Sequence, residues 1–207
     1  MNMKRQLTIL AAIACSLLPA SSQPSKGYPI TPVPFTSVKV TPGTFWGQRL
    51  EASRKVTIPL AFSKCEETDR YTNFSNAAKH LQDPSKVFDI KKGTFPFDDT
   101  DPYKTIEGAS YILQTYPDKA FAKYIDSVLN VIASAQEPDG YLYTARTQNP
   151  EHPHDWSGAK RWSAEEQGSH ELYNLGHMVE ATIAHYQATK SRKFLDIAIR
   201  FADLVCK

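Results

Sequence analysis

The sequence predicts an all-α protein built from helical hairpins. Two pairs of amphipathic segments, residues 101–136 and 170–206, are each divided by a short polar turn. Their apolar residues recur at helical spacing, whereas an extended pattern is confined to residues 37–41. Such hairpins stack so that one helix of each pair lines a centre and the other covers it. A closed ring of this kind needs about twelve helices and about five are indicated, so we expect the amino-terminal part of a longer protein.

Composition divides the chain into three regions. Residues 1–22 have two basic residues, an apolar stretch and small residues, the layout of a secretory signal peptide that is too short to span a membrane. We therefore expect an exported protein, periplasmic or extracellular, with lipid attachment at Cys15 as the alternative form of processing. Residues 23–43 form an irregular lead-in with a short strand at 37–41. Residues 44–207 form the helical domain.

The first half of the helical domain contains two predicted helices. The first covers residues 46–65, with a kink at Pro59. A long irregular stretch over residues 66–100 follows, and loops of that length tend to be functional. The next helix covers residues 101–116, because Asp101 suits an N-cap and Pro102 suits a first turn.

The second half begins with the most regular pattern in the chain, a helix over residues 119–136 that ends at Pro138-Asp139-Gly140. After a polar loop, the capping-box pattern at residues 163–166 predicts a helical turn. Helices over residues 170–188 and 193–206 complete the chain.

Charge and cysteine content exclude several classes of protein. The net charge is +2 and no basic patch with interleaved aromatic residues occurs, so no nucleic-acid partner is indicated. Beyond Cys15 the cysteines are Cys65 and Cys206, which excludes a disulfide scaffold. Each is expected as a buried free thiol, and a bridge between the two stays open.

The strongest candidate site lies in the segment from His170 to His177. At 100° per residue its apolar side chains gather on one face, while its polar ones share the opposite face with alanines. A helix without a charged face is typically packed on both sides, so the polar cluster is predicted to open onto an enclosed ligand cavity. The alternative is that these groups only cap the helix. In a complete homologue, substitution of His170 or Glu171 by alanine is expected to impair function greatly and leave the fold intact.

A second candidate lies at the entrance to the helix predicted from residue 101. Asp99 and Asp101 precede Lys104 by one turn, and carboxylates accept strong hydrogen bonds from sugar hydroxyls. Lys104 would be their counter-ion. Plain capping and dipole complementarity are the alternative for Asp101.

Taken together, these motifs resemble glycoside hydrolase family 127, the bacterial β-L-arabinofuranosidase-like enzymes. The resemblance covers the chain from about residue 36 and rests on these segments: Phe45-Trp46 with Arg49, residues 70–74, Asp99-Thr100-Asp101 with Lys104 and Glu107, Gln136 with residues 139–142, and residues 170–174 with Gly176-His177.

The resemblance implies an (α/α)6 barrel that releases terminal arabinofuranose, with retention, from plant glycans or glycoproteins. It also implies zinc in the full-length family members, held by cysteines and a glutamate late in the barrel, one cysteine being the nucleophile. Cys65 and Cys206 match neither the spacing nor the position of these ligands, so we expect no zinc on this chain and no hydrolysis by it alone. The residues that match the family's motifs as substrate contacts are His170 and Glu171, followed by Asp99, Asp101 and Lys104.

Two other readings stay open at the level of sequence. One is another hairpin-barrel sugar enzyme, such as an unsaturated uronyl hydrolase or a polysaccharide lyase, in which acidic residues replace cysteine and zinc. The other is a non-catalytic glycan-binding protein. In each case the partner is a glycan, and on the leading hypothesis it is an arabinose-containing oligosaccharide.

Overall fold

The computed structural model describes residue 30, residues 33–89 and residues 95–207. The chain divides into two units, Met1–Val38 and Lys39–Lys207. The first contains a 3-10 helix, Phe35–Ser37, and the second contains the helices discussed below. The predicted signal peptide and Cys15 lie outside the described residues. Within the described ranges, no helix is long and apolar enough to cross a membrane.

The all-α prediction is confirmed, but the predicted strand at residues 37–41 is wrong. No strand occurs among the described residues, and Ser37 ends the 3-10 helix. Val38 does have extended backbone angles. An extended segment becomes a strand only when a neighbour accepts its ladder of hydrogen bonds, and the described part of the chain provides none.

The first long helical stretch contains three segments, α2 (Phe45–Ala52), the π-helical turn η2 (Ser53–Thr57) and α3 (Ile58–Glu67). Just before Pro59, where a kink is predicted, the structure has this widened turn. Proline has no N–H group and its ring clashes with the carbonyl four residues earlier. In η2 the Ile58 N–H bonds to the Ser53 carbonyl, five residues back, which makes room for that ring.

Residues 66–100, expected to be irregular, contain a further helix, α4 (Arg70–Gln82). Its sequence is polar and contains the Asn-Phe-Ser-Asn run that resembles a turn. Packing decides the outcome, because Phe74 and Ala77 are completely buried and the Phe74 ring meets that of Tyr103 at 6.0 Å. Tertiary burial therefore overrides weak local helix propensity here.

Two hairpins follow at nearly the predicted boundaries. The first is α5 (Thr100–Thr115) with α6 (Lys119–Ser134), and the Asp118 carboxylate caps α6 by accepting from two backbone N–H groups. The second is α8 (Glu171–Thr189) with α9 (Lys193–Val205). Between them lie the short helix α7 (Thr144–Thr147) and the 3-10 helix η3 (Asp155–Ser157). Residues 163–166 form turns and no helix.

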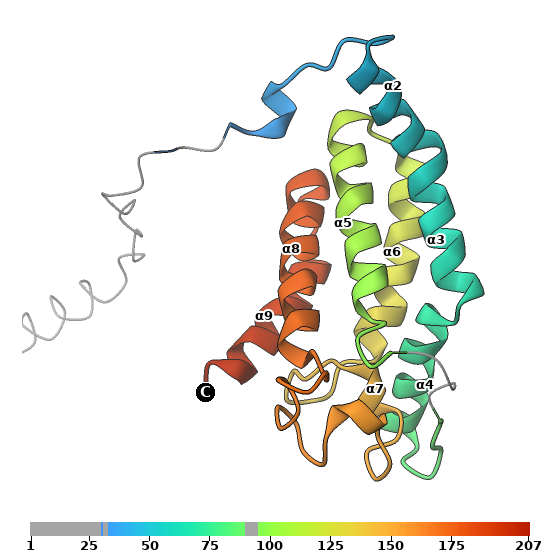
Figure 1. The fold of residues 1–207 in the computed structure, drawn as a ribbon, viewed down its shortest axis with the longest axis vertical. Helices are drawn as coiled ribbons and strands as arrows, with labels where there is room; N and C mark the ends of the chain where they lie inside the picture. Colours follow the sequence, from blue (N-terminus) through green and yellow to red (C-terminus); the bar gives the residue numbers. More distant parts are fainter. Residues whose placement is uncertain (1–29, 31–32, 90–94) are drawn as a thin grey trace, which may run out of the picture. The chain divides into compact units, whose positions relative to one another are not determined.

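The two hairpins are joined through α5 and α8, which lie side by side and run in the same direction (Figure 1). Lys104 bonds to Tyr173 near their first turns, and Gln114 bonds to the Ala184 carbonyl near their ends. Helix α9 packs against α8 and α6. The loops around α7 gather at the end where α5 and α8 begin, which places the two predicted site segments together (Figure 1).

Helix α8 is predicted to be packed on both faces, but the structure buries the face with the small residues and leaves part of the apolar face exposed. Asn174, Ala181 and Ala184 are buried, whereas Leu172 and Ile183 are each 46% exposed. Small side chains let α5 and α8 approach closely, and this contact decides which face turns inward. Cys206, expected to be buried, is exposed; Cys65 is buried, and both thiols are free.

Candidate functional site

Glu171, the first residue of α8, is completely buried. The Tyr141 hydroxyl donates to Oε2 at 2.6 Å, and the Trp162 backbone N–H donates to Oε1 at 2.9 Å. Burial raises the pKa of this carboxyl, and these two hydrogen bonds oppose the rise. Both carboxylate oxygens therefore already have a protein partner. Through these bonds Glu171 links the start of α8 to Tyr141, which follows α6, and to Trp162, which precedes α8.

Arg146, on α7, stabilises the segment that leads from η3 to α8. Its guanidinium donates to the carbonyls of Ser157, Gly158 and Lys160 at 2.5–3.2 Å. Nearby, the Tyr143 hydroxyl donates to the Ser169 carbonyl at 2.7 Å. Because these groups are buried and bonded, the loop from η3 to α8 is rigidly supported.

Glu165 determines where α8 begins. Its Oε1 accepts from the backbone N–H groups of Glu171 and Leu172, at 2.6 and 3.2 Å, and from the Ser169 hydroxyl at 3.1 Å. The capping box predicted at residues 163–166 is therefore wrong, because Ser163 bonds to Lys160 and no helix starts there, but Glu165 within that run caps the helix that begins six residues downstream. The residue just before the helix, His170, has a left-handed backbone with φ of 56°. That conformation is uncommon outside glycine, and the cap helps to maintain it.

Asp99 is buried in a similar way. Its carboxylate accepts from the Thr144 backbone N–H at 2.8 Å and from the Thr144 hydroxyl at 2.6 Å, which joins the start of α5 to α7. Burial raises the pKa of Asp99 to about 7, although both Thr144 donors act in the opposite direction. Asp99 is therefore a structural link between two elements.

Asp101 and Lys104 are the accessible members of the predicted set. Arg70 lies between Asp98 and Asp101, with N–O separations of 3.2 and 3.0 Å. Lys104 donates to the Tyr173 hydroxyl at 2.7 Å, and its Nζ lies 4.8 Å from the centre of the Tyr173 ring. Asp101 and Lys104 also line a shallow hollow of about 270 Å³ between α3 and α5.

The His170 ring contacts both the segment that precedes α5 and the first turn of α8. Its ring lies 4.8 Å from that of Phe97, just ahead of α5, and 5.6 Å from that of Tyr173 on α8. His170 is half-buried, and its neighbour Tyr173 also accepts a hydrogen bond from Lys104.

The structure therefore separates the five predicted residues into two groups. His170, Lys104 and Asp101 lie at the accessible ends of α5 and α8, while Asp99 and Glu171 are buried and bonded to protein groups. Their role as substrate contacts stays a prediction. Sequence reasoning missed Tyr173 as the partner of Lys104, because only the packing of α5 on α8 brings together two residues 69 positions apart.

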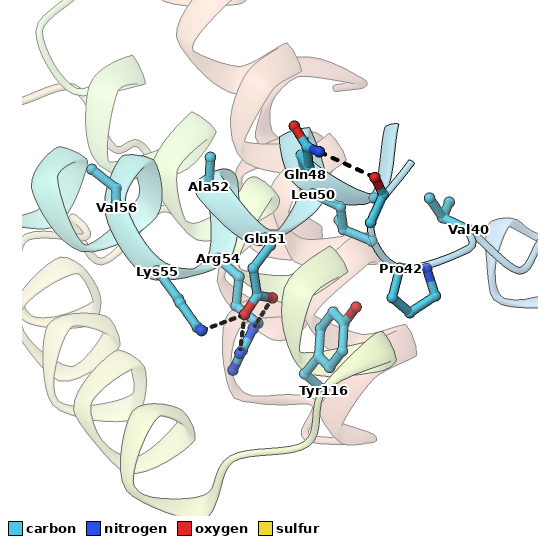
Figure 2. Close-up of a pocket in the computed structure, with 12 residues that line it drawn as sticks. Val40, Pro42, Gln48, Leu50, Glu51, Ala52, Arg54, Lys55, Val56 and Tyr116 are labelled. Atoms are coloured by element: carbon cyan, nitrogen blue, oxygen red, sulfur yellow. Dashed lines mark hydrogen bonds and ion pairs between the residues drawn. The ribbon is translucent and has the colours of Figure 1, made fainter. Parts of the chain in front are cut away.

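A larger hollow, of about 630 Å³, lies at the other end of α5 (Figure 2). It is lined by residues of 40–56 and by Tyr116. Glu51 binds both Arg54 and Lys55 there, and these hydrogen bonds lower the pKa of Glu51 to about 2. The hollow contains none of the predicted site residues, and its two cations are already paired with one carboxylate.

The zinc site that the resemblance implies for full-length members does not fit the residues present. Within the described ranges, no group of three or more His, Cys, Asp or Glu side chains is arranged to hold a metal ion. Cys65 lies 3.8 Å from the Thr105 hydroxyl, and burial raises the pKa of its thiol. Cys206 is exposed beyond α9.

Comparison with known proteins gives consistent results. Residues 37–207 match the family model of the beta-L-arabinofuranosidase GH127 catalytic domain. A non-reducing end beta-L-arabinofuranosidase of Bifidobacterium longum subsp. longum is 34% identical over 134 residues, which cover 62% of this chain and 19% of that protein.

Two solved structures share the fold. A GH127 beta-arabinofuranosidase is 69% identical with a TM-score of 0.81, over 87% of this chain and 27% of the other. A GH127 beta-L-arabinofuranosidase from Geobacillus stearothermophilus T6 is 31% identical with a TM-score of 0.67, over 78% and 24%. The chain thus spans about a fifth to a quarter of the length of these relatives. Because the family model matches most of its residues, the chain belongs to the GH127 beta-L-arabinofuranosidase family, within the catalytic domain.

Proposed function

We propose that this chain forms the amino-terminal part of the sugar-binding site of an exported, retaining β-L-arabinofuranosidase. Such an enzyme releases terminal arabinofuranose from plant glycans or glycoproteins. The observation that carries the proposal is the position of His170, between Phe97 and Tyr173 at the joint entrance of α5 and α8, in a chain that matches the GH127 catalytic domain.

Each predicted residue has a role in this proposal. The His170 ring, the Lys104 ammonium and the Asp101 carboxylate face the sugar and exchange hydrogen bonds with its hydroxyl groups. Glu171 and Asp99 position them, since each fixes the start of the helix that carries a contact residue. This division follows from burial, because a carboxylate enclosed by protein donors has few lone pairs left for a ligand.

The 207-residue chain alone is proposed to bind the sugar without hydrolysing it. The family resemblance implies a metal-bound cysteine as nucleophile, and the described part of the chain has no metal-ligand cluster around either thiol. An aryl β-L-arabinofuranoside should therefore release no phenol at enzyme-like rates. Turnover by the purified chain would contradict this part of the proposal.

Binding of methyl β-L-arabinofuranoside, measured by isothermal titration calorimetry, tests the site itself. His170→Ala should weaken binding at least tenfold, because the hydrogen bond between the imidazole and the sugar hydroxyl is lost. His80→Ala is the matched control, since His80 lies on α4 and bonds to the Lys86 carbonyl. Equal affinities for the wild type and His170→Ala would refute the assignment.

A further inference from the structure

His170 belongs to a continuous series of ring contacts that extends well beyond the predicted site. We define the aromatic row as Trp156, Phe95, Phe97, His170 and Tyr173. Successive ring centres lie 5.8, 5.0, 4.8 and 5.6 Å apart in that order. The row joins η3, the segment before α5 and the start of α8, which are distant in the sequence.

Both ends of the row are open to solvent. Trp156 is 47% exposed, Phe95 45% and Tyr173 45%, while Phe97 and His170 between them are half-buried. Isolated exposed rings are common, but five rings in mutual contact with three exposed are not explained by core packing. Because each ring is held by the next, little side-chain entropy remains to be lost when a ligand binds.

The Trp156 end of the aromatic row is also held in place by contacts with the protein. The Trp156 backbone N–H donates to the His154 ring nitrogen at 3.1 Å, and the Trp156 side chain lies over Gly168. A Cβ added at Gly168 would stand 3.6 Å from the Trp156 ring, so the indole rests directly on this turn. At the other end, Lys104 fixes the Tyr173 hydroxyl.

The chemistry of the row fits a sugar chain better than an apolar partner. Phe95 and Phe97 are stacked on each other, and the exposed rings of the row provide apolar surface, while the indole, imidazole and phenol groups and the Lys104 ammonium provide polar edges. Sugar rings present the same combination, with C–H faces and hydroxyl edges. Each step along the row is comparable to the length of one sugar residue.

We infer that the aromatic row is a stacking platform for the part of a glycan that extends beyond the terminal arabinofuranose, with Trp156 and Phe95 as its outer subsite. This inference rests on the proposed function, because it places the terminal sugar at His170. The ligand class is a neutral oligosaccharide of three or more sugar units.

Calorimetry with two probes tests the inference on the full 207-residue chain. The probes are methyl β-L-arabinofuranoside and an arabinose trisaccharide that ends in β-L-arabinofuranose. Trp156→Ala should weaken binding of the trisaccharide about tenfold and leave binding of the monosaccharide unchanged. Trp156→Phe should restore most of the lost affinity, since it keeps an aromatic face.

Trp46→Ala is the matched control, because Trp46 is an exposed tryptophan on α2 whose ring contacts that of Phe45. It should leave both affinities unchanged, and thermal melts followed by circular dichroism establish that each variant is folded. If Trp156→Ala proves unfolded, Phe95→Ala serves the same purpose at the neighbouring exposed ring.

The outcomes separate the two proposals. Wild-type trisaccharide affinity in Trp156→Ala, with His170→Ala still weakening both probes, overturns the platform and leaves the proposed function intact. Absence of binding of either probe to the wild type overturns both. Absence of any effect of His170→Ala on either probe overturns the proposed site and, with it, the platform, because the platform places the terminal sugar at His170.

Discussion

Asp99 and Glu171 show how burial changes the meaning of an acidic motif. The sequence places both in polar clusters next to helix starts, where they resemble ligand contacts. The structure encloses both and gives each carboxylate two protein donors. On the proposed function, Asp99 and Glu171 would therefore act on a ligand through the helices that they hold, while His170 and Lys104 would contact it directly.

Asp99 should make stability depend on pH in an unusual direction. Its folded-state pKa of about 7 lies above its ordinary value of 3.8, so the folded protein binds the proton more tightly than the unfolded chain. This contribution is fully present below about pH 4 and is lost as the pH rises through about 7.

Asp99→Asn should remove that dependence, because the amide keeps the shape and does not ionise. Between pH 4.5 and 7.5 the free energy of unfolding of the wild type, relative to Asp99→Asn, should fall by roughly 2 to 4 kcal/mol. Urea titrations of both proteins at a series of pH values measure this difference in the free energy of unfolding. A constant difference between the two proteins would show that Asp99 titrates normally.

Glu171→Ala should destabilise the fold, contrary to what the sequence alone predicts. The change leaves the Tyr141 hydroxyl and the Trp162 N–H without their acceptor in a buried position, at a cost of about 2 to 5 kcal/mol. Glu171→Gln keeps one acceptor oxygen and should lose less. Chemical unfolding of both variants tests this order, and an unaltered midpoint for Glu171→Ala would restore the view that this residue serves only the ligand.

At the level of elements, the start of α8 depends on a residue outside the helix. The Glu165 carboxylate accepts two backbone N–H groups of the first turn and is placed at the positive end of the helix dipole. It thereby also fixes His170, the residue between the cap and the helix.

Glu165→Ala should lower the free energy of unfolding by about 1 to 2 kcal/mol, because these donors lose their partner. Glu166→Ala is the control, since the neighbouring carboxylate is exposed and makes no side-chain hydrogen bond that defines α8. Thermal or urea unfolding of the two variants gives the comparison. Equal losses would indicate a general charge effect and no specific cap.

For the molecule as a whole, one surface property to consider is the set of exposed apolar side chains on the second hairpin. Leu172 and Ile183 on α8, with Ile199 and Val205 on α9, are each 40–46% exposed. Exposed apolar surface of this kind binds hydrophobic dyes and promotes association.

The double variant Ile183→Gln/Ile199→Gln should therefore bind less of the dye ANS and associate less in analytical ultracentrifugation. Val56→Gln is the control, because Val56 is also exposed but lies in the turn between α2 and α3. A decrease in dye binding as large for Val56→Gln as for the double variant would contradict a special role for the second hairpin.

The sequence by itself determined the helical class, the two hairpins and the family. These follow from local information: the apolar period of α6 and α9, the Pro-Asp-Gly turn after α6, and motifs of fixed spacing. The expected irregularity of the helix at Pro59 also follows from a single residue, and the structure has a π-helical turn just before that proline.

Tertiary structure alone decided which of these residues are enclosed. Helix α4 forms because Phe74 meets Tyr103, and the alanine face of α8 turns inward because it fits closely against α5. The aromatic row likewise combines three segments that are separated along the chain. Burial depends on neighbours brought by the fold, so no local pattern in the sequence determines whether a carboxylate or a ring faces a ligand or the core.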